Sequence, residues 1–326
     1  MGRFLNVGII QMPVSKDTSV NLNYIEKKVN DLMCAYHRPE LILGVEGGIG
    51  YFTPQEIPGP ITDFLGRIAK KNGIYFIPGT MYEKKGDAIY NAAPIFNPKG
   101  ELIAVYRKMA PWRPAEDAAA PGYEYVVFDI PEKETKIGVQ ICYDLNFPEI
   151  SRNETLMGAE VLVKITMDPE ELYRLNKPVH FTRALENQAF LVSTNGVGPF
   201  GGTYMYGNSL VINPEGQLLW EAGPQETLAT VTLDLDLVSR SREYGTIFMD
   251  HYLQHLKEYA FPMPYANNLS EAPLYKTLGA APRNVAQYET QVEKIGSLNV
   301  GKSSPEGPLP EELETALSAY LEKHKE

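Results

Sequence analysis

The second half of this chain repeats the order of segments found in its first half. The clearest match pairs Ile95-Phe-Asn-Pro-Lys-Gly-Glu-Leu-Ile103 with Val211-Ile-Asn-Pro-Glu-Gly-Gln-Leu-Leu219. Three further apolar pairs keep the same order, at offsets of about 115 to 130 residues: 5–11 with 135–141, 40–46 with 160–166, and 73–80 with 188–195. Apolar strands often look alike, so one pair carries little weight, but an ordered set of four indicates two copies of one structural unit.

Each copy has the pattern strand, helix, strand, helix, strand, hairpin. Apolar spacing predicts helices at 18–36 and 60–72 in the first copy, and at 148–159 and 169–189 in the second. Alternating strands and helices are typical of an α/β fold in which helices cover one face of a mixed sheet. Two such halves, related by a pseudo-two-fold axis, predict a four-layer α-β-β-α sandwich with an internal repeat.

The texture of the sequence changes near residue 259. The last 68 positions, 259–326, are rich in proline and weakly periodic, with one short amphipathic helix expected at 310–323. Their scattered tyrosine, phenylalanine and leucine residues need a surface to pack on. We therefore predict a domain over 1–258 and an extended C-terminal arm over 259–326.

Composition limits the partners and the compartment. The net charge of −11 argues against nucleic acid, and no apolar run approaches the length of a membrane span. Two cysteines cannot build a disulfide framework, so we expect a reducing, cytoplasmic location. Cys34 is expected on the buried side of the first helix and to be inert.

Reactive side chains follow three of the predicted strands. Glu46 follows the apolar run 41–45, Lys108 closes the run 102–108, and Cys142 follows the run 137–141. Each has an ordinary structural reading: a cap, a salt-bridge partner or a buried core thiol. Ligands gather at the carboxyl ends of the strands in open α/β sheets, however, and there the three would supply a base, a cation and a nucleophile.

Cys142 is the sharpest of these signals. Asp-Leu-Asn and Pro148 follow it, which predicts a strand-to-helix turn whose positive helix end lowers the pKa of the thiol. A carboxylate would take the thiol proton, the thiolate would attack a carbon that bears nitrogen, and an ammonium with backbone N–H groups would hold the oxyanion.

Segments 106–116 (Tyr-Arg-Lys-Met-Ala-Pro-Trp-Arg-Pro-Ala-Glu), 141–152 (Ile-Cys-Tyr-Asp-Leu-Asn-Phe-Pro-Glu-Ile-Ser-Arg) and 158–163 resemble the nitrilase superfamily of carbon–nitrogen hydrolases. Within it they are similar to the aliphatic amidase and formamidase branch, over about residues 5–258. The resemblance implies a Glu46, Lys108 and Cys142 triad. It also implies that Glu116 orients substrate and steadies the lysine, and that the Tyr143 N–H binds the substrate oxygen.

The resemblance also implies a substrate pocket, with contacts from Tyr143, Trp112, Gly47 and Asp144. The chain departs from the family beside the base. Gly-Val precedes Glu46 where the family has Phe-Pro, and Gly47 stands where the branch has a tyrosine that lines a small acyl pocket. Losing that ring predicts a pocket that is larger or differently gated.

The leading hypothesis is an amidase that converts a small aliphatic amide to its acid and ammonia, because the Trp112 and Glu116 segment favours amides. A nitrilase or a carbamoyl or ureido amidohydrolase would use the same triad, and a catalytically silent binding subunit is a further alternative. No cofactor is expected. The His251 and His255 pair has metal-ligand spacing but no accompanying acid cluster, so no metal is expected either. Relatives in this branch form dimers or hexamers, which implies a homo-oligomer whose C-terminal arm reaches a neighbour.

Overall fold

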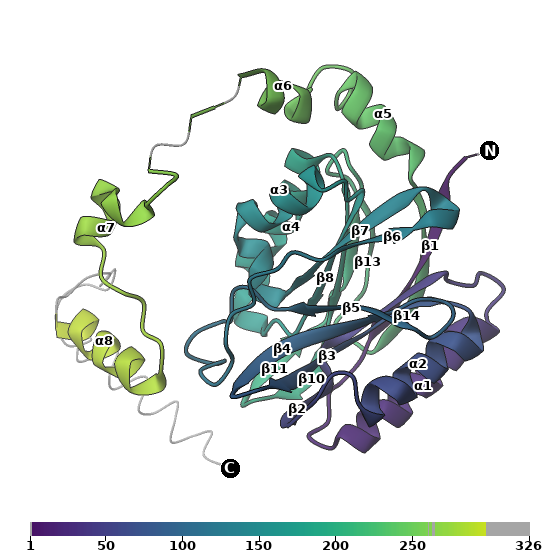
Figure 1. The fold of residues 1–326 in the computed structure, drawn as a ribbon, viewed down its shortest axis with the longest axis horizontal. Coiled ribbons are helices and arrows are strands. Elements are labelled where there is room, and N and C mark those ends of the chain that lie inside the picture. The colour runs from purple at the N-terminus through teal and green to yellow at the C-terminus, as the bar shows by residue number, and fades with distance from the viewer. Residues whose placement is uncertain (1, 260, 263–264, 298–326) are drawn as a thin grey trace, which may run out of the picture. The chain divides into compact units, whose positions relative to one another are not determined.

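The computed structural model describes residues 2–259, 261–262 and 265–297. Its contacts divide the chain into two compact units, one formed by Met1–Trp112 with Ala118–Leu278, the other by Arg113–Asp117 with Gly279–Glu326. The larger unit holds both sheets and the helices that cover them (Figure 1). The domain boundary predicted at 258/259 stays a prediction, and the helix expected at 310–323 lies outside the described residues.

The first half of the chain, together with one strand from the end of the second half, builds one sheet. Among the described residues it has six strands, in the order β14 (Thr227–Asp234), β1 (Phe4–Gln11), β2 (Leu41–Gln55), β3 (Tyr75–Lys85), β4 (Ala88–Phe96) and β5 (Leu102–Arg107). The strands β1, β2 and β3 are parallel, β4 and β5 form an antiparallel hairpin beside them, and β14 pairs antiparallel with β1.

The second half repeats this arrangement. Its sheet has the described strands β13 (Leu218–Glu221), β12 (Leu210–Ile212), β9 (Phe190–Asn195), β8 (Val161–Thr166), β7 (Thr135–Ile141) and β6 (Val127–Ile130). Again three parallel strands, β7, β8 and β9, lie between an antiparallel edge strand and a hairpin. The matching strand orders confirm the internal repeat.

The two hairpins also share their turn. Asn97 and Asn213 each accept a hydrogen bond from the N–H of a glycine three residues later, at 2.9 and 3.0 Å. Those glycines, Gly100 and Gly216, have φ of 80° and 73°. This left-handed conformation is one that glycine adopts without steric cost. The Asn-Pro-x-Gly motif is therefore a turn signal that both copies use in the same way.

Each sheet packs on the other sheet with one face and on helices with its opposite face, which gives four layers. Helices α1 (Thr18–Cys34) and α2 (Pro60–Asn72) cover the first sheet, and α3 (Pro148–Leu156) and α4 (Tyr173–Asn187) cover the second (Figure 1). Leu5, Val7 and Ile9 of β1 belong to the core between the two sheets, whereas Ile10 belongs to the core beneath α1. This alternation is the two-residue period of a strand. The predicted α-β-β-α sandwich is confirmed.

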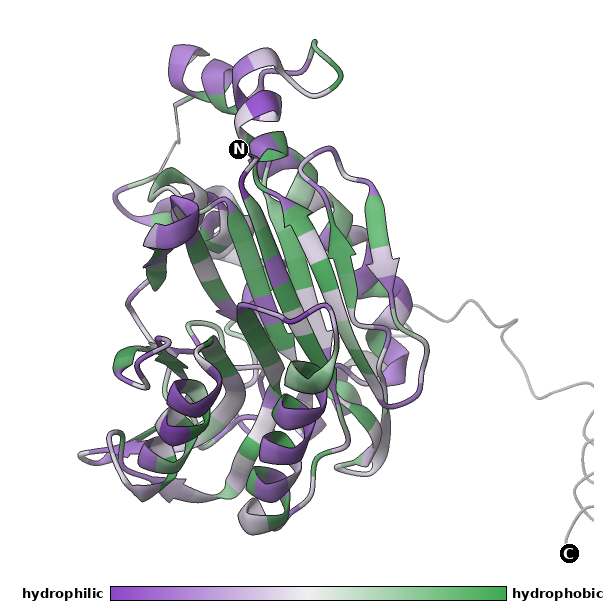
Figure 2. Cartoon of the chain, turned by 90° about the vertical axis from the view of Figure 1, so that its right-hand side faces the viewer, coloured by the Kyte–Doolittle hydropathy of each residue, from purple (hydrophilic) through white to green (hydrophobic). Residues whose placement is uncertain are grey.

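The remaining described elements belong neither to the two six-stranded sheets nor to the four helices that cover them. They are the hairpin β10 (Val197–Phe200) and β11 (Thr203–Tyr206), the 3₁₀ turns Pro131–Lys133, Cys142–Asn146, Glu170–Leu172 and Leu269–Glu271, and helices α5 (Asp236–Tyr244), α6 (Tyr252–Tyr259), α7 (Pro273–Thr277) and α8 (Val285–Ser297). The strands are the most hydrophobic part of the chain, whereas the helices carry many hydrophilic residues (Figure 2). Within the described residues, no helix has the length and apolarity needed to cross a bilayer.

Candidate active site

Cys142 begins a sharp turn between strand and helix, as predicted. The strand β7 ends at Ile141, a 3₁₀ turn spans Cys142–Asn146, and α3 starts at Pro148. Cys142 has φ of +52°, a left-handed conformation that is uncommon for a residue with a side chain. Such a conformation persists only where the surroundings enforce it, and it is frequent at reactive residues.

Asp144 is the residue that enforces the turn. Its carboxylate accepts hydrogen bonds from the Ile141 N–H at 3.0 Å, the Tyr106 hydroxyl at 2.8 Å and the Ala110 N–H at 2.7 Å. Burial raises the pKa of Asp144 to about 6 against the lowering effect of Lys108. Since protein donors engage both oxygens, Asp144 joins the cysteine turn to the segment after Lys108. These contacts give Asp144 a structural role, and the substrate contact that the resemblance implied stays a prediction.

Glu46 lies in a bulge within β2, which continues beyond it and does not end at Val45 as the sequence predicted. Regular pairing with β3 joins Val45 to Gly79 and resumes only at Gly50 with Met81. The residues between Val45 and Gly50 lie outside the regular pairing with β3. Among them Gly47 has φ of +68°, a left-handed conformation that the bulge requires. The bulge is what turns Glu46 away from the strand ladder.

Glu46 and Lys108 form a buried ion pair. The Lys108 ammonium lies 2.9 Å from Glu46 Oε1, and the two side chains are 1% and 3% exposed. Asn91 Nδ2 donates to the same oxygen at 2.8 Å, and the Met167 N–H donates to Oε2 at 3.0 Å. These donors fix the carboxylate, so the pair predicted from two distant strand ends is present.

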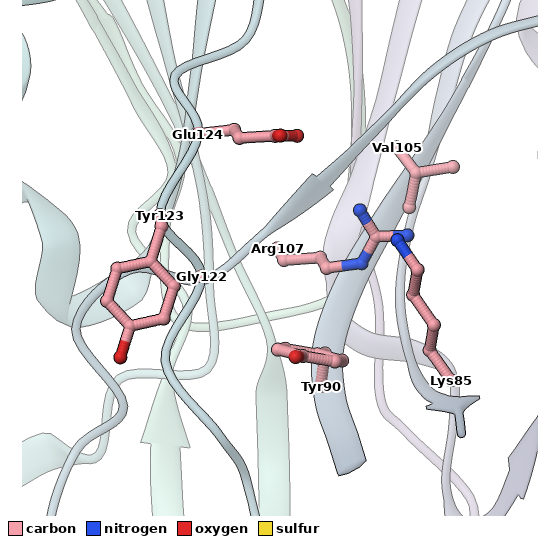
Figure 3. Close-up of a pocket in the computed structure, with 7 residues that line it drawn as sticks. All are labelled: Lys85, Tyr90, Val105, Arg107, Gly122, Tyr123 and Glu124. Atoms are coloured by element: carbon pink, nitrogen blue, oxygen red, sulfur yellow. The ribbon is translucent and has the colours of Figure 1, made fainter. Parts of the chain in front are cut away.

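Successive side chains along a strand point to opposite faces, so Lys108 points toward Glu46 and Arg107 points away from it. Arg107 instead pairs with Glu83, with Nη2 2.7 Å from Oε1. It lines an open groove of about 290 Å³ on the other side of this strand, and none of the predicted site residues lines that groove. Figure 3 shows its lining residues, which are Lys85, Tyr90, Val105, Arg107, Gly122, Tyr123 and Glu124.

Both charges of the Glu46–Lys108 pair affect the pKa of the Cys142 thiol. Burial raises its pKa well above the ordinary value, the negative charge of Glu46 adds to this rise, and Lys108 opposes it. The expectation that a helix end lowers this pKa is wrong, because Cys142 is only 8% exposed and desolvation penalises the thiolate. Cys142 is therefore favoured as a thiol, and any reaction at its sulfur would need a base.

A second lysine–carboxylate pair, missed in the sequence, also touches the cysteine. Asp168 Oδ1 accepts a hydrogen bond from Cys142 Sγ at 3.4 Å, and Lys164 Nζ lies 2.6 Å from Asp168 Oδ2. The sequence predicted a helix over 169–189, directly after Asp168, but α4 begins only at Tyr173. The available signal was Lys164, a cation within the otherwise uncharged strand β8.

The space against Gly47 is filled by an aromatic ring. A Cβ built on Gly47 would lie 2.2 Å from Cε2 of Tyr51, so the ring packs directly on the glycine. Tyr82 and Phe200 contact this ring, with centroids 5.1 and 6.0 Å away. The open space expected from the missing tyrosine is thus occupied here by Tyr51, four residues later in the chain.

The other predicted site residues are less constrained. Tyr143 is half-buried and packs edge-on against Phe147, at 5.2 Å between ring centroids, and Trp112 is 37% exposed. As the second residue of its 3₁₀ turn, Tyr143 has an N–H without an acceptor inside that turn. Glu116 belongs to the smaller compact unit, so its role beside Lys108 stays a prediction.

Two expectations concern residues outside the site. Cys34 is exposed at the end of α1, so the prediction of a buried residue is wrong. The rings of His251 and His255 lie 5.8 Å apart, and His255 stacks on Tyr259. Within the described residues, no group of three or more His, Cys, Asp or Glu side chains is arranged to hold a metal ion.

Comparisons with known proteins agree with this architecture. The carbon-nitrogen hydrolase family matches residues 6–243. The omega-amidase NIT2 of Xenopus tropicalis is 28% identical over 265 residues, which cover 74% of this chain and 93% of that protein. The human omega-amidase NIT2 is 29% identical over 218 residues, or 62% of this chain and 77% of the relative.

Solved structures give the same result. Saccharomyces cerevisiae Nit3, a member of branch 10 of the nitrilase superfamily, superimposes with a TM-score of 0.69 at 25% identity, over 74% of this chain and 94% of Nit3. An amidase from Nesterenkonia sp. superimposes with a TM-score of 0.64 at 25% identity, over 73% and 94%. The nitrilase-superfamily resemblance is confirmed: the chain belongs to the carbon-nitrogen hydrolase family and is an amidase-type enzyme that hydrolyses carbon–nitrogen bonds.

Proposed function

We propose that the chain hydrolyses a small aliphatic amide to the carboxylic acid and ammonia, with Cys142 as the nucleophile. The observation that carries this proposal is the buried Glu46–Lys108 pair, whose two charges both act on the Cys142 thiol. A base, a cation and a nucleophile enclosed together are the groups that acyl transfer requires.

In the first half of the reaction the amide is cleaved. Glu46 takes the proton from Cys142, and Sγ forms a bond to the carbonyl carbon. The Lys108 ammonium and the Tyr143 N–H stabilise the oxyanion that develops. Glu46 then returns its proton to the nitrogen, the carbon–nitrogen bond breaks, and ammonia leaves a thioester on Cys142.

The second half releases the acid. Glu46, again a carboxylate, takes a proton from water, and the hydroxide adds to the thioester carbon. Collapse of that intermediate breaks the carbon–sulfur bond, and Glu46 gives its proton back to sulfur. One carboxyl group therefore carries a proton in both directions, which suits the fixed contacts of Glu46 with Lys108, Asn91 and the Met167 N–H.

The relatives support an amide as the substrate class. The proteins named above include omega-amidases and an amidase. One structure of the Nesterenkonia amidase carries the acetamide moiety of fluoroacetamide covalently on its active-site cysteine. Within this chain, the aromatic ring of Tyr51 against Gly47 suggests a small acyl group, because it fills space next to the base.

An ammonia-release assay tests the proposal. A panel of amides from formamide to hexanamide is given to the parent chain, to Cys142→Ala and to Cys34→Ser as the matched control. We expect Cys142→Ala to fall to background and Cys34→Ser to match the parent, because Cys34 is exposed on α1, away from the site. Activity retained in Cys142→Ala would refute the proposed nucleophile.

The same panel separates the alternative substrates. The nitriles and the carbamoyl compounds of matching chain length are offered alongside each amide. The proposal expects kcat/KM to be highest for the amide. A higher value for the nitrile, or for the ureido compound, would assign the triad to that chemistry instead.

A further inference from the structure

The cysteine lies between two buried lysine–carboxylate pairs, and the proposed function uses only one of them. We propose that Asp168 is a further catalytic residue: its carboxylate accepts the hydrogen bond of the Cys142 thiol in the resting enzyme, and so keeps the sulfur protonated and oriented until the amide arrives. Lys164 is then a positioning residue that acts through Asp168. This inference rests on the proposed role of Cys142 as the nucleophile.

Asp168 is fixed on the thiol by contacts to both of its oxygens. Oδ1 accepts from Cys142 Sγ at 3.4 Å and from Thr166 Oγ1 at 2.7 Å. Oδ2 accepts from Lys164 at 2.6 Å, Asn176 at 3.0 Å and Tyr206 at 3.3 Å. A carboxylate held by this many donors cannot turn away, so the sulfur atom has a fixed acceptor beside it.

Lys164 is itself held as the cation of the pair. Its ammonium lies 3.4 Å from His180 Nε2, and His180 Nδ1 lies 2.7 Å from the Asn176 carbonyl oxygen. Because a carbonyl only accepts, Nδ1 carries the hydrogen, and Nε2 is an acceptor that faces Lys164 and, at 3.1 Å, Ser193 Oγ. Burial lowers the pKa of His180 to about 3, so the ring is neutral and adds no competing charge.

The charges around the sulfur come from several elements. Glu46 of β2 and Asp168, which follows β8, raise the pKa of the thiol after the larger effect of burial, whereas Lys108, which follows β5, and Lys164 of β8 lower it. Tyr206 of β11 also faces the sulfur, and burial keeps its hydroxyl neutral by raising its pKa. The thiol therefore has two carboxylates within electrostatic reach.

Asp168 holds the thiol without taking its proton. Burial favours the neutral form of Asp168, but the charge of Lys164 and the hydrogen bonds from Lys164 and Thr166 prevail and hold its pKa well below the usual range. So weak a base accepts a hydrogen bond but does not keep the proton. When the amide binds, the S–H bond must turn from Asp168 to Glu46, which takes the proton as sulfur attacks. No atom or electron is transferred to Asp168.

The test is the pH dependence of Cys142 alkylation by iodoacetamide, measured in the full chain carrying Cys34→Ser. Asp168→Asn removes the negative charge but keeps the shape. We expect the midpoint of the pH profile to move to lower pH by about one unit, which raises the alkylation rate below the midpoint about tenfold. Amide turnover should change in the opposite direction, with kcat falling tenfold or more and KM changing less, because the sulfur has lost its orientation (about 10²-fold for a 1 Å misplacement).

Glu154→Gln is the matched control. Glu154 is fully buried in the same half of the chain, and burial raises its pKa, so Glu154→Gln is a comparable change of a buried carboxyl group. It does not contact Cys142 in any described hydrogen bond, and its carboxyl accepts from Gln140 at 2.7 Å. The alkylation midpoint of this variant should equal that of the parent.

Two further variants keep the test decisive if Asp168→Asn does not fold. Lys164→Met/Asp168→Asn leaves no unpaired charge and should also lower the midpoint. Lys164→Met alone removes a cation and should raise it, because Lys164 lowers the thiol pKa. A midpoint that is unchanged or higher in both variants lacking the carboxylate, or full turnover in them, would overturn the inference. If Cys142→Ala kept full activity, the proposed function would fail instead.

Discussion

The Lys108 ammonium lies 2.9 Å from Glu46 Oε1, and neither side chain is more than 3% exposed. Burying two charges costs desolvation that their mutual attraction does not clearly repay, so such a pair is weak evidence for a stabilising role. It is better explained by chemistry. The pair holds a carboxylate and an ammonium next to a thiol in a volume from which water is largely excluded.

Replacing Lys108 tests the cation. Lys108→Met should lower kcat/KM by more than the roughly 10²–10³-fold typical of losing one oxyanion donor, because the ammonium also fixes Glu46. The uncompensated charge of Glu46 should in addition lower the free energy of unfolding by about 3–5 kcal/mol. Turnover and denaturant unfolding of the same preparation check both. A tenfold loss of kcat/KM would make Lys108 peripheral.

Comparing two glutamates tests which of them carries the proton. Glu46→Gln should abolish measurable turnover, since an amide cannot move a proton in both half-reactions. Glu116→Gln should lower turnover less, because the role implied for Glu116 is to orient the substrate. Both variants are assayed with the same amide after circular dichroism has established their folding. The reverse order of effects would exchange the two roles.

Asp144 should matter for the stability of the fold. Asp144→Asn places an amide N–H against a backbone N–H, so one buried donor loses its acceptor, at a cost of about 1–3 kcal/mol in the free energy of unfolding. Asp129→Asn is the matched control, because Asp129 lies on the surface, 3.3 Å from Lys136 with both side chains about half exposed, and its change should be within about 0.5 kcal/mol. Urea unfolding curves measure both. Equal stability of the two variants would contradict this structural role of Asp144.

The C-terminal extension should support a homo-oligomer. Leu274, Tyr275 and Leu278 are 61%, 47% and 57% exposed in the described chain, which is unusual for neighbouring apolar residues in one short segment. We expect a chain that ends at Tyr259 to sediment in a lower oligomeric state than the intact chain, with a Tm that depends more steeply on concentration. Leu274→Ser/Tyr275→Ser should shift the same equilibrium without deletion. Sedimentation of the intact chain as a monomer would contradict this expectation.

The fold was readable from the sequence because the repeat supplied long-range information. The pairs such as 95–103 with 211–219 aligned the two halves, and the strand orders of the two sheets follow from that alignment. Cys142 was recognisable because its turn has a local signature, an apolar strand followed by polar turn residues and Pro148.

Other features depend on tertiary contacts that no local pattern encodes. Asp168 resembles a helix cap in sequence, and only the approach of β7 to β8 brings it to the sulfur of Cys142. The raised pKa of that thiol arises first from burial, which depends on how the two sheets pack. The ring of Tyr51 lies against Gly47 because the β2 bulge, where the register with β3 shifts, brings the two residues together.

The most direct test of the account is the mass of the peptide that contains Cys142 after acid quenching during turnover of a saturating amide. The proposed thioester predicts that this peptide gains the mass of the acyl group in place of one hydrogen, while the Cys34 peptide is unchanged. Release of one ammonia per active site with the Cys142 peptide unmodified would contradict the account.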